Sequence, residues 1–392
     1  MRAVTVPLER DIDLNDIARG DGYLFVRDGV GFAGRGVAAR VPVDDAVGYL
    51  AAIDHDDRVG GTNGPIALGA IPFLPWAPAE LVVPAVVVGK DERGRAWVTT
   101  IDGADEQLAP ERDPVPTAAA WSVRPGVDVD RYLAAVAAAR DAVRSGRMDK
   151  AVIARPVVVE SDRPIDLHAV LRRLKATFGS SHRFSIDGFV GASPELLVGV
   201  EGDTVSAFPL AGTTRTTGDP ELDAKLAAEL HASPKNRIEH RAAIEMVRDT
   251  LLPYCSYLDW SPEPEIVKVA NVQHLGSRAE GKLSRPAATV IELVRALQPT
   301  PAVGGHPRDA AIDLITAVEG FERGVYGGAV GWCDGRGDGR WAVALRCAEL
   351  SDDRRSARLV AGGGIVADSE PLSELAETQA KFQAMLSALV RP

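Results

Sequence analysis

Residues 361–381 read AGGGIVADSEPLSELAETQAK, and this stretch constrains the fold more than any other part of the chain. A run of glycines is followed by a helix that begins at Pro371. On that helix Glu374, Glu377 and Lys381 are spaced i, i+3 and i+7, which places two carboxylates and an ammonium on one face. The glycines let backbone N–H groups approach an anion closely. The stretch predicts a site for a metal ion and a small carboxylated ligand, but Glu377 and Lys381 also fit an ordinary ion pair on an exposed helix.

The composition is typical of a globular protein with an acidic surface. The 392 residues are 46% hydrophobic and 25% charged, and the formal net charge is −11. Nucleic-acid-binding proteins normally have a basic face, so no nucleic-acid partner is expected. An acidic protein binds a small dianion only where local cations or a metal ion reverse the field.

Cysteine usage and hydropathy indicate the compartment. The three cysteines, Cys255, Cys333 and Cys347, are far apart and include no CxxC pair, so we expect buried thiols in a reducing compartment. No apolar run reaches the length of a membrane span, and the N-terminal residues lack a signal-peptide pattern. We therefore predict a cytoplasmic protein without membrane contact, and a monomer, since no interface stripe is visible.

The pattern of apolar residues changes along the chain. Up to residue 125 short strand-like segments alternate with turns, and the polar, proline-containing Thr100–Pro125 is expected to be a surface connection. From Asp128 onward helices and strands are mixed without a regular βαβ cycle, which predicts an α+β architecture. Among the expected elements are helices at Val129–Arg144 and Leu167–Thr177, helices that begin at Pro220 and Pro234, and strands at Lys150–Glu160, Arg183–Val190, Val267–Leu275 and Trp341–Glu349.

One short motif points toward a different class of protein. Gly29–Gly34 matches GxGxxG and follows a strand, as a dinucleotide-binding loop would. A dinucleotide site needs a helix of several turns next, whereas Val41-Pro42-Val43 breaks the chain after a few residues. We interpret the segment as a hairpin loop and do not expect nicotinamide binding.

Nine segments, the stretch 361–381 among them, form a pattern in the part of the chain from Asp128 to Leu389. They are MDKAVIAR (148–155), GASPELL (191–197), PLAGTTR (209–215), KNRIEH (235–240), VQHLGS (272–277), PTPAVGG (299–305), GVYGGAVGW (324–332), ALRCAEL (344–350) and the stretch 361–381. In this order and spacing they resemble the chorismate-utilising enzymes. That family includes isochorismate, salicylate, anthranilate and aminodeoxychorismate synthases.

The resemblance implies a fold and a metal. The expected fold is a single α+β domain, residues 1–392, in which two large β-sheets pack together with helices outside and the site between them. Residues 1–125 correspond to the variable start, and 128–389 to the motif-bearing part. The resemblance also implies Mg²⁺, with Glu239 and Glu377 at the positions of the metal ligands and Glu374 at a nearby acidic position. Carboxylate oxygens suit Mg²⁺, which takes the rest of its shell from water and ligand.

The resemblance further implies which residues bind the substrate, chorismate. Arg346, Tyr326 and the glycines near 363 and 364 are expected to hold a carboxylate, and Arg346, in an apolar alternating strand, has a planar guanidinium suited to that task. His274 is expected near the ring hydroxyl, and Lys381 near the metal carboxylates. The full set of matching positions is Gly212, Thr213, His274, Ala302, Val303, Tyr326, Arg346, Gly363, Gly364 and Lys381.

Two residues are implied to carry the chemistry. Every member of this family removes the C4 hydroxyl of chorismate, which requires a proton donor. Glu195 matches that acid, and its apolar neighbours in GASPELL should keep it protonated near neutrality. Lys150 matches the base of the members that add water. Enzymes forming aminodeoxychorismate carry a lysine where Ala211 stands here, and no segment for glutamine amidotransfer is visible, so no amidotransferase subunit is expected.

The choice between the remaining reactions depends on the motif PTPAVGG. With Ala302 it resembles the isochorismate synthase version, whereas salicylate and anthranilate synthases tend to have threonine there. We therefore predict a Mg²⁺-dependent isochorismate synthase. The alternatives are a salicylate synthase, which goes on to eliminate pyruvate, and a catalytically inactive chorismate-binding subunit, which an intact Lys150 and Glu195 argue against. Gln298, where the family has histidine, and Asn236, in place of an acidic residue, depart from the family pattern.

Overall fold

A long antiparallel strand pairing forms the frame of the computed structural model, which describes residues 1–104, 108, 118, 120–269 and 272–390. β11 (Lys150–Ser161) pairs with β25 (Ser356–Ile365) from Ala151 opposite Ile365 to Glu160 opposite Ser356. Most of the paired residues are buried, as expected for neighbours inside a large sheet. The pairing places the three glycines 362–364 directly beside the first residues of β11, the strand that begins at Lys150.

That pairing belongs to a 13-stranded sheet built from both ends of the chain. Its path, from edge to edge, is β10 (Trp121–Pro125), β11, β25, β24 (Cys347–Leu350), β13 (Phe189–Ser193), β12 (His182–Ile186), β2 (Tyr23–Arg27), β3 (Val30–Arg35), β8 (Val86–Lys90), β9 (Ala96–Ile101), β1 (Arg2–Pro7) and β5 (Asp54–Asp57), with β21 (Gly305–His306) paired to β11.

Two further sheets complete the strands of the described residues. The nine-stranded sheet runs β17 (Cys255–Trp260), β20 (Ala279–Leu283), β15 (Thr204–Phe208), β14 (Leu196–Glu201), β23 (Gly339–Val343), β22 (Ala329–Asp334), β6 (Ile66–Ile71), β7 (Glu80–Val83) and β4 (Ala39–Pro42). The third sheet has three strands, β16 (Leu210–Arg215), β19 (Val272–Gly276) and β18 (Glu265–Val269).

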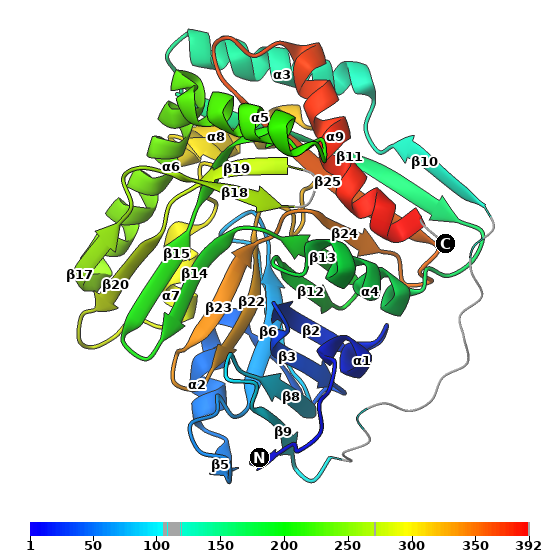
Figure 1. Ribbon diagram of the computed structural model, residues 1–392, viewed down its shortest axis with the longest axis vertical. Helices are drawn as coiled ribbons and strands as arrows, with labels where there is room; N and C mark the ends of the chain where they lie inside the picture. The colour runs from blue at the N-terminus through cyan, green and yellow to red at the C-terminus, as the bar shows by residue number, and fades with distance from the viewer. Residues whose placement is uncertain (105–107, 109–117, 119, 270–271, 391–392) are drawn as a thin grey trace.

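The two large sheets share a buried core, and helices cover their outer faces (Figure 1). Phe25 and Phe184 from the larger sheet pack in one cluster with Leu68 and Val330 from the other. The α-helices are α1 (Leu14–Ala18), α2 (Ala46–Ala51), α3 (Val129–Arg144), α4 (Leu167–Phe178), α5 (Pro220–Ala232), α6 (Pro234–Leu251), α7 (Val290–Leu297), α8 (Arg308–Val318) and α9 (Pro371–Val390). The predicted α+β class with two large packed sheets is therefore confirmed, and the small third sheet is an addition to it.

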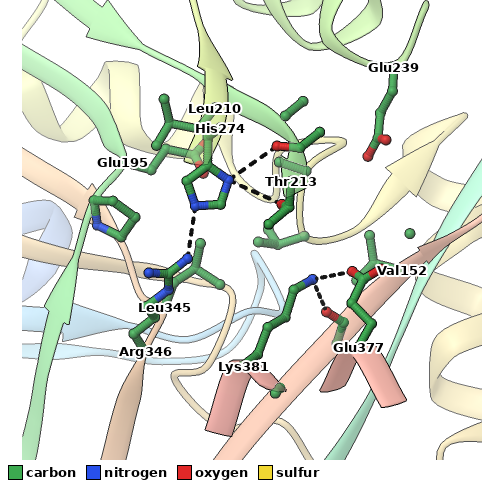
Figure 2. A pocket seen from close by; sticks show the side chains of 18 of the residues that line it. Val152, Glu195, Leu210, Thr213, Glu239, His274, Leu345, Arg346, Glu377 and Lys381 are labelled. Atoms are coloured by element: carbon green, nitrogen blue, oxygen red, sulfur yellow. Dashed lines mark hydrogen bonds and ion pairs between the residues drawn. The ribbon is translucent and has the colours of Figure 1, made fainter. Parts of the chain in front are cut away.

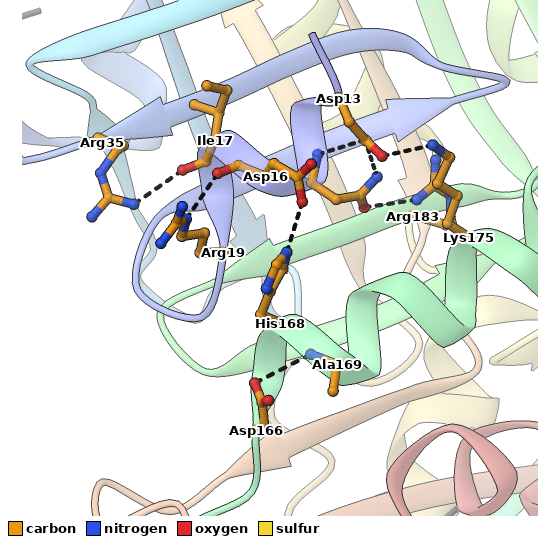
Figure 3. Close-up of polar contacts among 11 residues, drawn as sticks. Asp13, Asp16, Ile17, Arg19, Arg35, Asp166, His168, Ala169, Lys175 and Arg183 are labelled. Carbon is orange, nitrogen blue, oxygen red and sulfur yellow. Dashed lines mark hydrogen bonds and ion pairs between the residues drawn. The ribbon is translucent and has the colours of Figure 1, made fainter. Parts of the chain in front are cut away.

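Polar contacts fix α1 against α4 on the outer side of the larger sheet (Figure 3). His168 Nε2 lies within hydrogen-bond distance of Asp16 Oδ1, at 2.9 Å. Lys175 Nζ donates to Asp13 Oδ2 at 2.6 Å. Beneath them the buried Arg183 donates from Nη1 to Asn15 Oδ1 at 2.9 Å. These contacts attach the N-terminal part of the chain to the motif-bearing part.

The helix predictions are close to the observed bounds, but three predicted strands are wrong. The predicted strand at 183–190 is two strands, β12 and β13, which meet at Asp187-Gly188, where both residues have positive φ. The predicted strand at 267–275 is the antiparallel pair β18 and β19. Half of the predicted surface connection at 100–125 lies outside the described residues, and its last five residues form β10.

The third error matters most for the site. The predicted strand at 341–349 is β23 followed by β24, and the two belong to different sheets. Arg346 therefore lies in the short crossing between the sheets, with a left-handed backbone of φ 50°, and not within a strand. The GxGxxG segment forms a turn at Gly29 followed by β3, paired with β2, so the hairpin interpretation is confirmed. None of the helices that the structure describes is long and apolar enough to cross a membrane.

The packing of α9 generates a stability prediction. Phe382 is buried in the core cluster under α9, and its ring lies beneath the Arg155 guanidinium at 5.0 Å. Phe382→Ala should lower the free energy of unfolding by about 3–5 kcal/mol, because it removes a buried aromatic ring and leaves a cavity. Leu372→Ala is the matched control on the same helix, since Leu372 is 71% exposed, and should change it by less than about 0.5 kcal/mol. Urea denaturation of both variants measures the difference, and equal losses would contradict this packing.

Candidate active site

One cavity gathers most of the residues singled out in the sequence. It encloses about 1080 Å³, open solvent at its mouth included. The predicted residues that line it are Glu195, Gly212, Thr213, Glu239, His274, Ala302, Val303, Tyr326, Arg346, Gly364, Glu374, Glu377 and Lys381. Lys150 and Gly363 do not line it, but Lys150 contacts Glu239 and Gly363 lies against Glu374.

All three sheets contribute to the wall. Val152 and Gly364 come from the 13-stranded sheet, Thr213 and His274 from the three-stranded sheet, and Glu195 directly precedes β14 of the nine-stranded sheet. In Figure 2, Glu195, His274 and Arg346 lie on one side of the cavity, whereas Glu239, Glu377 and Lys381 lie on the other. The cavity thus has two chemically different sides.

Hydrogen bonds fix the protonation state of His274. Arg346 Nη2 lies 2.8 Å from His274 Nε2, and because a guanidinium only donates, Nε2 must accept. The other ring nitrogen, Nδ1, lies 3.1 Å from the carbonyl oxygen of Gly212 and 3.1 Å from Thr213 Oγ1, so Nδ1 carries the proton. Burial, and then the charge of Arg346, lower the pKa of His274 to about 3. His274 is therefore a neutral residue that orients Arg346, not a proton donor.

The guanidinium of Arg346 has a donor group that a ligand in the cavity could bind. Its Nη1 is buried and has no hydrogen-bond partner among the described residues. Burial lowers the pKa of Arg346 to about 10, so the guanidinium stays charged at neutral pH. A buried, charged donor without a partner is costly, and a bidentate carboxylate would satisfy it. The backbone φ of 50° is the local strain that aims this side chain.

A bulge in β16 shapes the wall next to His274. The register between β16 and β19 shifts between Ala211 and Thr213, and Gly212 takes φ 71°. A Cβ at Gly212 would also lie 3.2 Å from Asn236 on α6. The position therefore requires glycine, and the bulge turns the Gly212 carbonyl and the Thr213 hydroxyl toward His274.

Glu195 is a buried acid. Burial raises its pKa to about 8, while a backbone hydrogen bond from Leu210 and the charge of Lys150 act in the opposite direction. Its backbone is held by Ser193 Oγ, which accepts from the Glu195 N–H at 3.3 Å, and by Val343, whose N–H donates to the Glu195 carbonyl at 3.1 Å. A carboxyl group of this kind is protonated at neutral pH and can give up its proton inside the cavity.

Ion pairs occupy the other side of the cavity. Lys150 Nζ donates to Glu239 Oε1 at 2.5 Å, and Lys381 Nζ pairs with Glu377 Oε1 at 2.7 Å. Lys381 also donates to the carbonyl of Gly362 at 2.8 Å, which ties α9 to β25. Ser369 donates from Oγ to Glu374 Oε1 at 2.8 Å.

The glycine run lets these carboxylates approach the sheet. A Cβ at Gly363 would lie 2.6 Å from Glu374 Oε2, and a Cβ at Gly364 would lie 3.2 Å from Glu239 Oε1. A side chain at Gly363 would therefore displace Glu374, and one at Gly364 would displace Lys150, whose Cε would lie 2.6 Å from the Cβ. The donor set, carboxylate oxygens only, suits Mg²⁺. Among residues 1–104, 120–269 and 272–390, however, no three His, Cys, Asp or Glu side chains stand close enough together to form a ready-made metal centre.

Several lining residues escaped the sequence reasoning. Val152 and Leu345 line the cavity beside predicted residues, and their only signal is that each lies within a quoted motif. Asn236, noted in the sequence only as a departure from the family pattern, lines the cavity as well. Tyr326 lies where expected and is 5% exposed, and burial raises its pKa above the ordinary value.

The fold and this cavity together define an enzyme that binds a small carboxylated ligand, and comparison with known proteins gives the class. The family model described as chorismate binding enzyme matches residues 79–390. The chain belongs to the chorismate-binding enzyme family, so the resemblance seen in the sequence is confirmed.

Individual relatives agree with this assignment. "Putative isochorismate synthase MenF" of Mycobacterium tuberculosis is 42% identical over 341 residues, covering 83% of this chain and 87% of that protein. Isochorismate synthase DhbC of Bacillus subtilis is 36% identical over 353 residues, covering 87% and 85%. In fold, the chain is similar to MenF, the menaquinone-specific isochorismate synthase from Escherichia coli, with a TM-score of 0.85, 24% identity and coverage of 100% of this chain and 94% of that one.

The hydrogen bonds around His274 predict an unusual titration. His274 should stay neutral, with the proton on Nδ1, at every pH from 8 down to about 4, because burial and Arg346 oppose its protonation. Long-range ¹H–¹⁵N NMR of the imidazole, assigned with a His274→Gln variant, measures both the tautomer and the titration. The exposed His306 supplies a reference imidazole signal from a ring in contact with solvent. A His274 ring that titrates between pH 6 and 7, or that carries its proton on Nε2, would contradict the arrangement.

Proposed function

We propose that this chain is an isochorismate synthase that converts chorismate to isochorismate, with Lys150 as base and Glu195 as acid. The observation that carries the proposal is the position of Glu195, a buried carboxyl with a raised pKa, in the same cavity as Glu239 and its partner Lys150. The similarity to relatives named isochorismate synthase supports the same reaction over pyruvate elimination.

Glu195 supplies the proton for the leaving group. Hydroxide is a poor leaving group, so the C4 hydroxyl must be protonated as its bond to carbon breaks. A carboxyl with a pKa of about 8 is protonated at pH 7 and is then well matched to that task. As C4–O breaks, the ring double bonds shift, and the electron deficit reaches C2.

Lys150 takes the proton of the attacking water. The residue is buried at the start of β11, and Gly364 on the neighbouring strand leaves room for its aliphatic chain, since a Cβ there would lie 2.6 Å from Lys150 Cε. Water adds at C2 while hydroxyl leaves C4, so the reaction is an isomerisation and should be reversible.

Arg346 and the groups near it bind a substrate carboxylate. The unpartnered Nη1 of Arg346 is the donor that a carboxylate would satisfy, and His274 holds the guanidinium in place. Tyr326, Thr213 and Gly212 complete this side, and Ala302 and Val303 supply apolar contact to the ring. The backbone of the glycine run reaches a carboxylate from the side of Glu374 and Glu239.

The proposal includes Mg²⁺ as cofactor. Glu239, Glu374 and Glu377 would hold the ion, which when bound neutralises charge on a substrate carboxylate. Lys381 supports these acids through its bonds to Glu377 and Gly362.

Further parts of the proposal come from the sequence. The chain acts as one catalytic domain, residues 1–392, on a small-molecule substrate, in the cytoplasm and as a monomer. It needs no amidotransferase subunit, nucleic acid or membrane.

The product mixture tests the reaction. Purified protein with chorismate and Mg²⁺ at neutral pH should form isochorismate, and the same mixture of the two isomers should be reached from isochorismate. Liquid chromatography of the products measures this, and a parallel sample with EDTA should show no turnover. Salicylate as the main product, without isochorismate, would favour the salicylate synthase alternative and overturn this assignment.

The raised pKa of Glu195 predicts a pH limb and a loss on substitution. A general acid works only while protonated, so kcat should fall as pH rises through about 8, the folded-state pKa. Glu195→Gln should lower kcat by about 10²–10⁴ without changing the far-UV circular dichroism. Glu201→Gln, at the exposed end of β14, is the matched control and should keep the wild-type rate. A Glu195→Gln enzyme with wild-type kcat would remove Glu195 from the mechanism.

A further inference from the structure

A gap interrupts the strand pairing along one edge of β11. Near its start, Val152 N–H donates to the Gly304 carbonyl at 2.8 Å, beside the short strand β21. Farther along, β10 pairs with β11 from Val157 onward. Between these two partners, no described strand lies beside Val152 and Ala154 on this edge. Backbone groups buried there without partners would be costly.

Two side chains fill this gap in place of a strand. Glu319 Oε1 accepts a hydrogen bond from Ala154 N–H at 2.7 Å, and Arg323 Nη2 donates to the Val152 carbonyl at 2.7 Å. Glu319 is the C-cap residue directly after α8, and Arg323 follows in the next loop. Together they complete the pairing of the strand that begins at Lys150.

Arg323 also contacts two further elements whose residues line the cavity. Its Nη1 donates to the Val303 carbonyl at 2.7 Å, and Val303 lines the cavity. Its guanidinium lies 4.3 Å from the centroid of the Phe73 ring and 5.9 Å from that of Tyr326. One cation therefore connects β11, the PTPAVGG loop and Tyr326, although neither Arg323 nor Glu319 lines the cavity.

The pair is ionic and almost completely buried. Arg323 Nη2 lies 2.5 Å from Glu319 Oε1, and Nε lies 2.9 Å from Oε2. The two side chains are 3% and 1% exposed. A buried ion pair is a weak source of stability, because desolvation offsets most of its attraction, whereas its geometry is highly specific. Its value here is that it fixes backbone positions.

We propose that Glu319 and Arg323 are positioning residues of the active site: they set the relative positions of β11, the PTPAVGG loop and Tyr326. This inference rests on the proposed function for its kinetic readout. Displacing reacting groups by about 1 Å can cost as much as 10²-fold in rate, so a small shift of β11 should be visible in kcat.

The test separates the hydrogen bond from the charge. Glu319→Gln keeps an acceptor for Ala154 N–H but loses the charge, whereas Glu319→Leu loses both. Arg323→Lys keeps a charge, but its ammonium has three donors at one point and cannot span the four acceptor atoms that Arg323 bonds, Glu319 Oε1 and Oε2 and the carbonyls of Val152 and Val303. Glu349→Gln is the matched control, because Glu349 pairs with Arg358 at 2.5 Å on β24 and β25, and neither residue lines the cavity.

We expect activity to follow the hydrogen bonds. Glu319→Leu and Arg323→Lys should lower kcat by more than about tenfold at a temperature where all variants are folded, with a smaller change in KM. Glu319→Gln should lose thermal stability, because it leaves the Arg323 charge buried, yet stay within about threefold of the wild-type kcat. Glu349→Gln should lose stability without losing kcat.

Amide hydrogen exchange gives a readout that does not depend on catalysis. Peptides containing Ala154 should exchange faster in Glu319→Leu than in Glu319→Gln, whereas peptides from β12 should be unchanged. If Glu319→Leu leaves exchange at Ala154 unaltered, or if kcat follows thermal stability alike in all four variants, the positioning role is wrong. A wild-type protein that fails to form isochorismate would overturn the proposed function instead, and the exchange experiment would still decide the positioning of β11.

Discussion

The antiparallel pairing of β11 with β25 is the constraint on which the rest of the site depends. It joins the strand that begins at Lys150 to the strand that ends in the glycine run. Because residues 362–364 have no side chains, Glu374 on α9 and Glu239 on α6 can both lie against the same short length of strand. Lys381 then bonds to the Gly362 carbonyl and ties α9 to this frame. A side chain at Gly363 would displace Glu374, and one at Gly364 would displace Lys150, the partner of Glu239, so either would disturb the cavity.

On the other side of the cavity, a chain of hydrogen bonds fixes the position of Arg346. Gly212 needs its left-handed backbone to form the bulge in β16. The bulge presents an acceptor to His274 Nδ1, which leaves Nε2 free to accept from Arg346. Arg346 in turn lies where the chain crosses from one large sheet to the other. Its position is thus a product of the whole fold, and its buried Nη1, which has no partner among the described residues, is available to a ligand.

Local signals account for the parts that were predictable from the sequence. Pro371 and the spacing of Glu374, Glu377 and Lys381 predict α9 and its acidic face, and the apolar run after Lys150 predicts β11. The break at Arg346 was not predictable, because apolar alternation continues while the chain changes sheets. The contribution of Glu319 and Arg323 was hidden for a similar reason: an acid and a base four residues apart are typical of a solvent-exposed helix, and only tertiary packing buries them.

The ion pairs of the cavity have a consequence for ligand binding. Its walls hold two cations, Lys381 and Arg346, and three carboxylates, Glu239, Glu374 and Glu377, while Glu195 is uncharged at neutral pH. Lys150 lies just behind the wall and pairs with Glu239, which offsets the third carboxylate. The interior is therefore close to electroneutral. A dicarboxylate ligand and a divalent cation also sum to zero, so the two together preserve this balance and either one alone upsets it. Such a cavity favours loading both as a pair, and each should strengthen the binding of the other by the same factor.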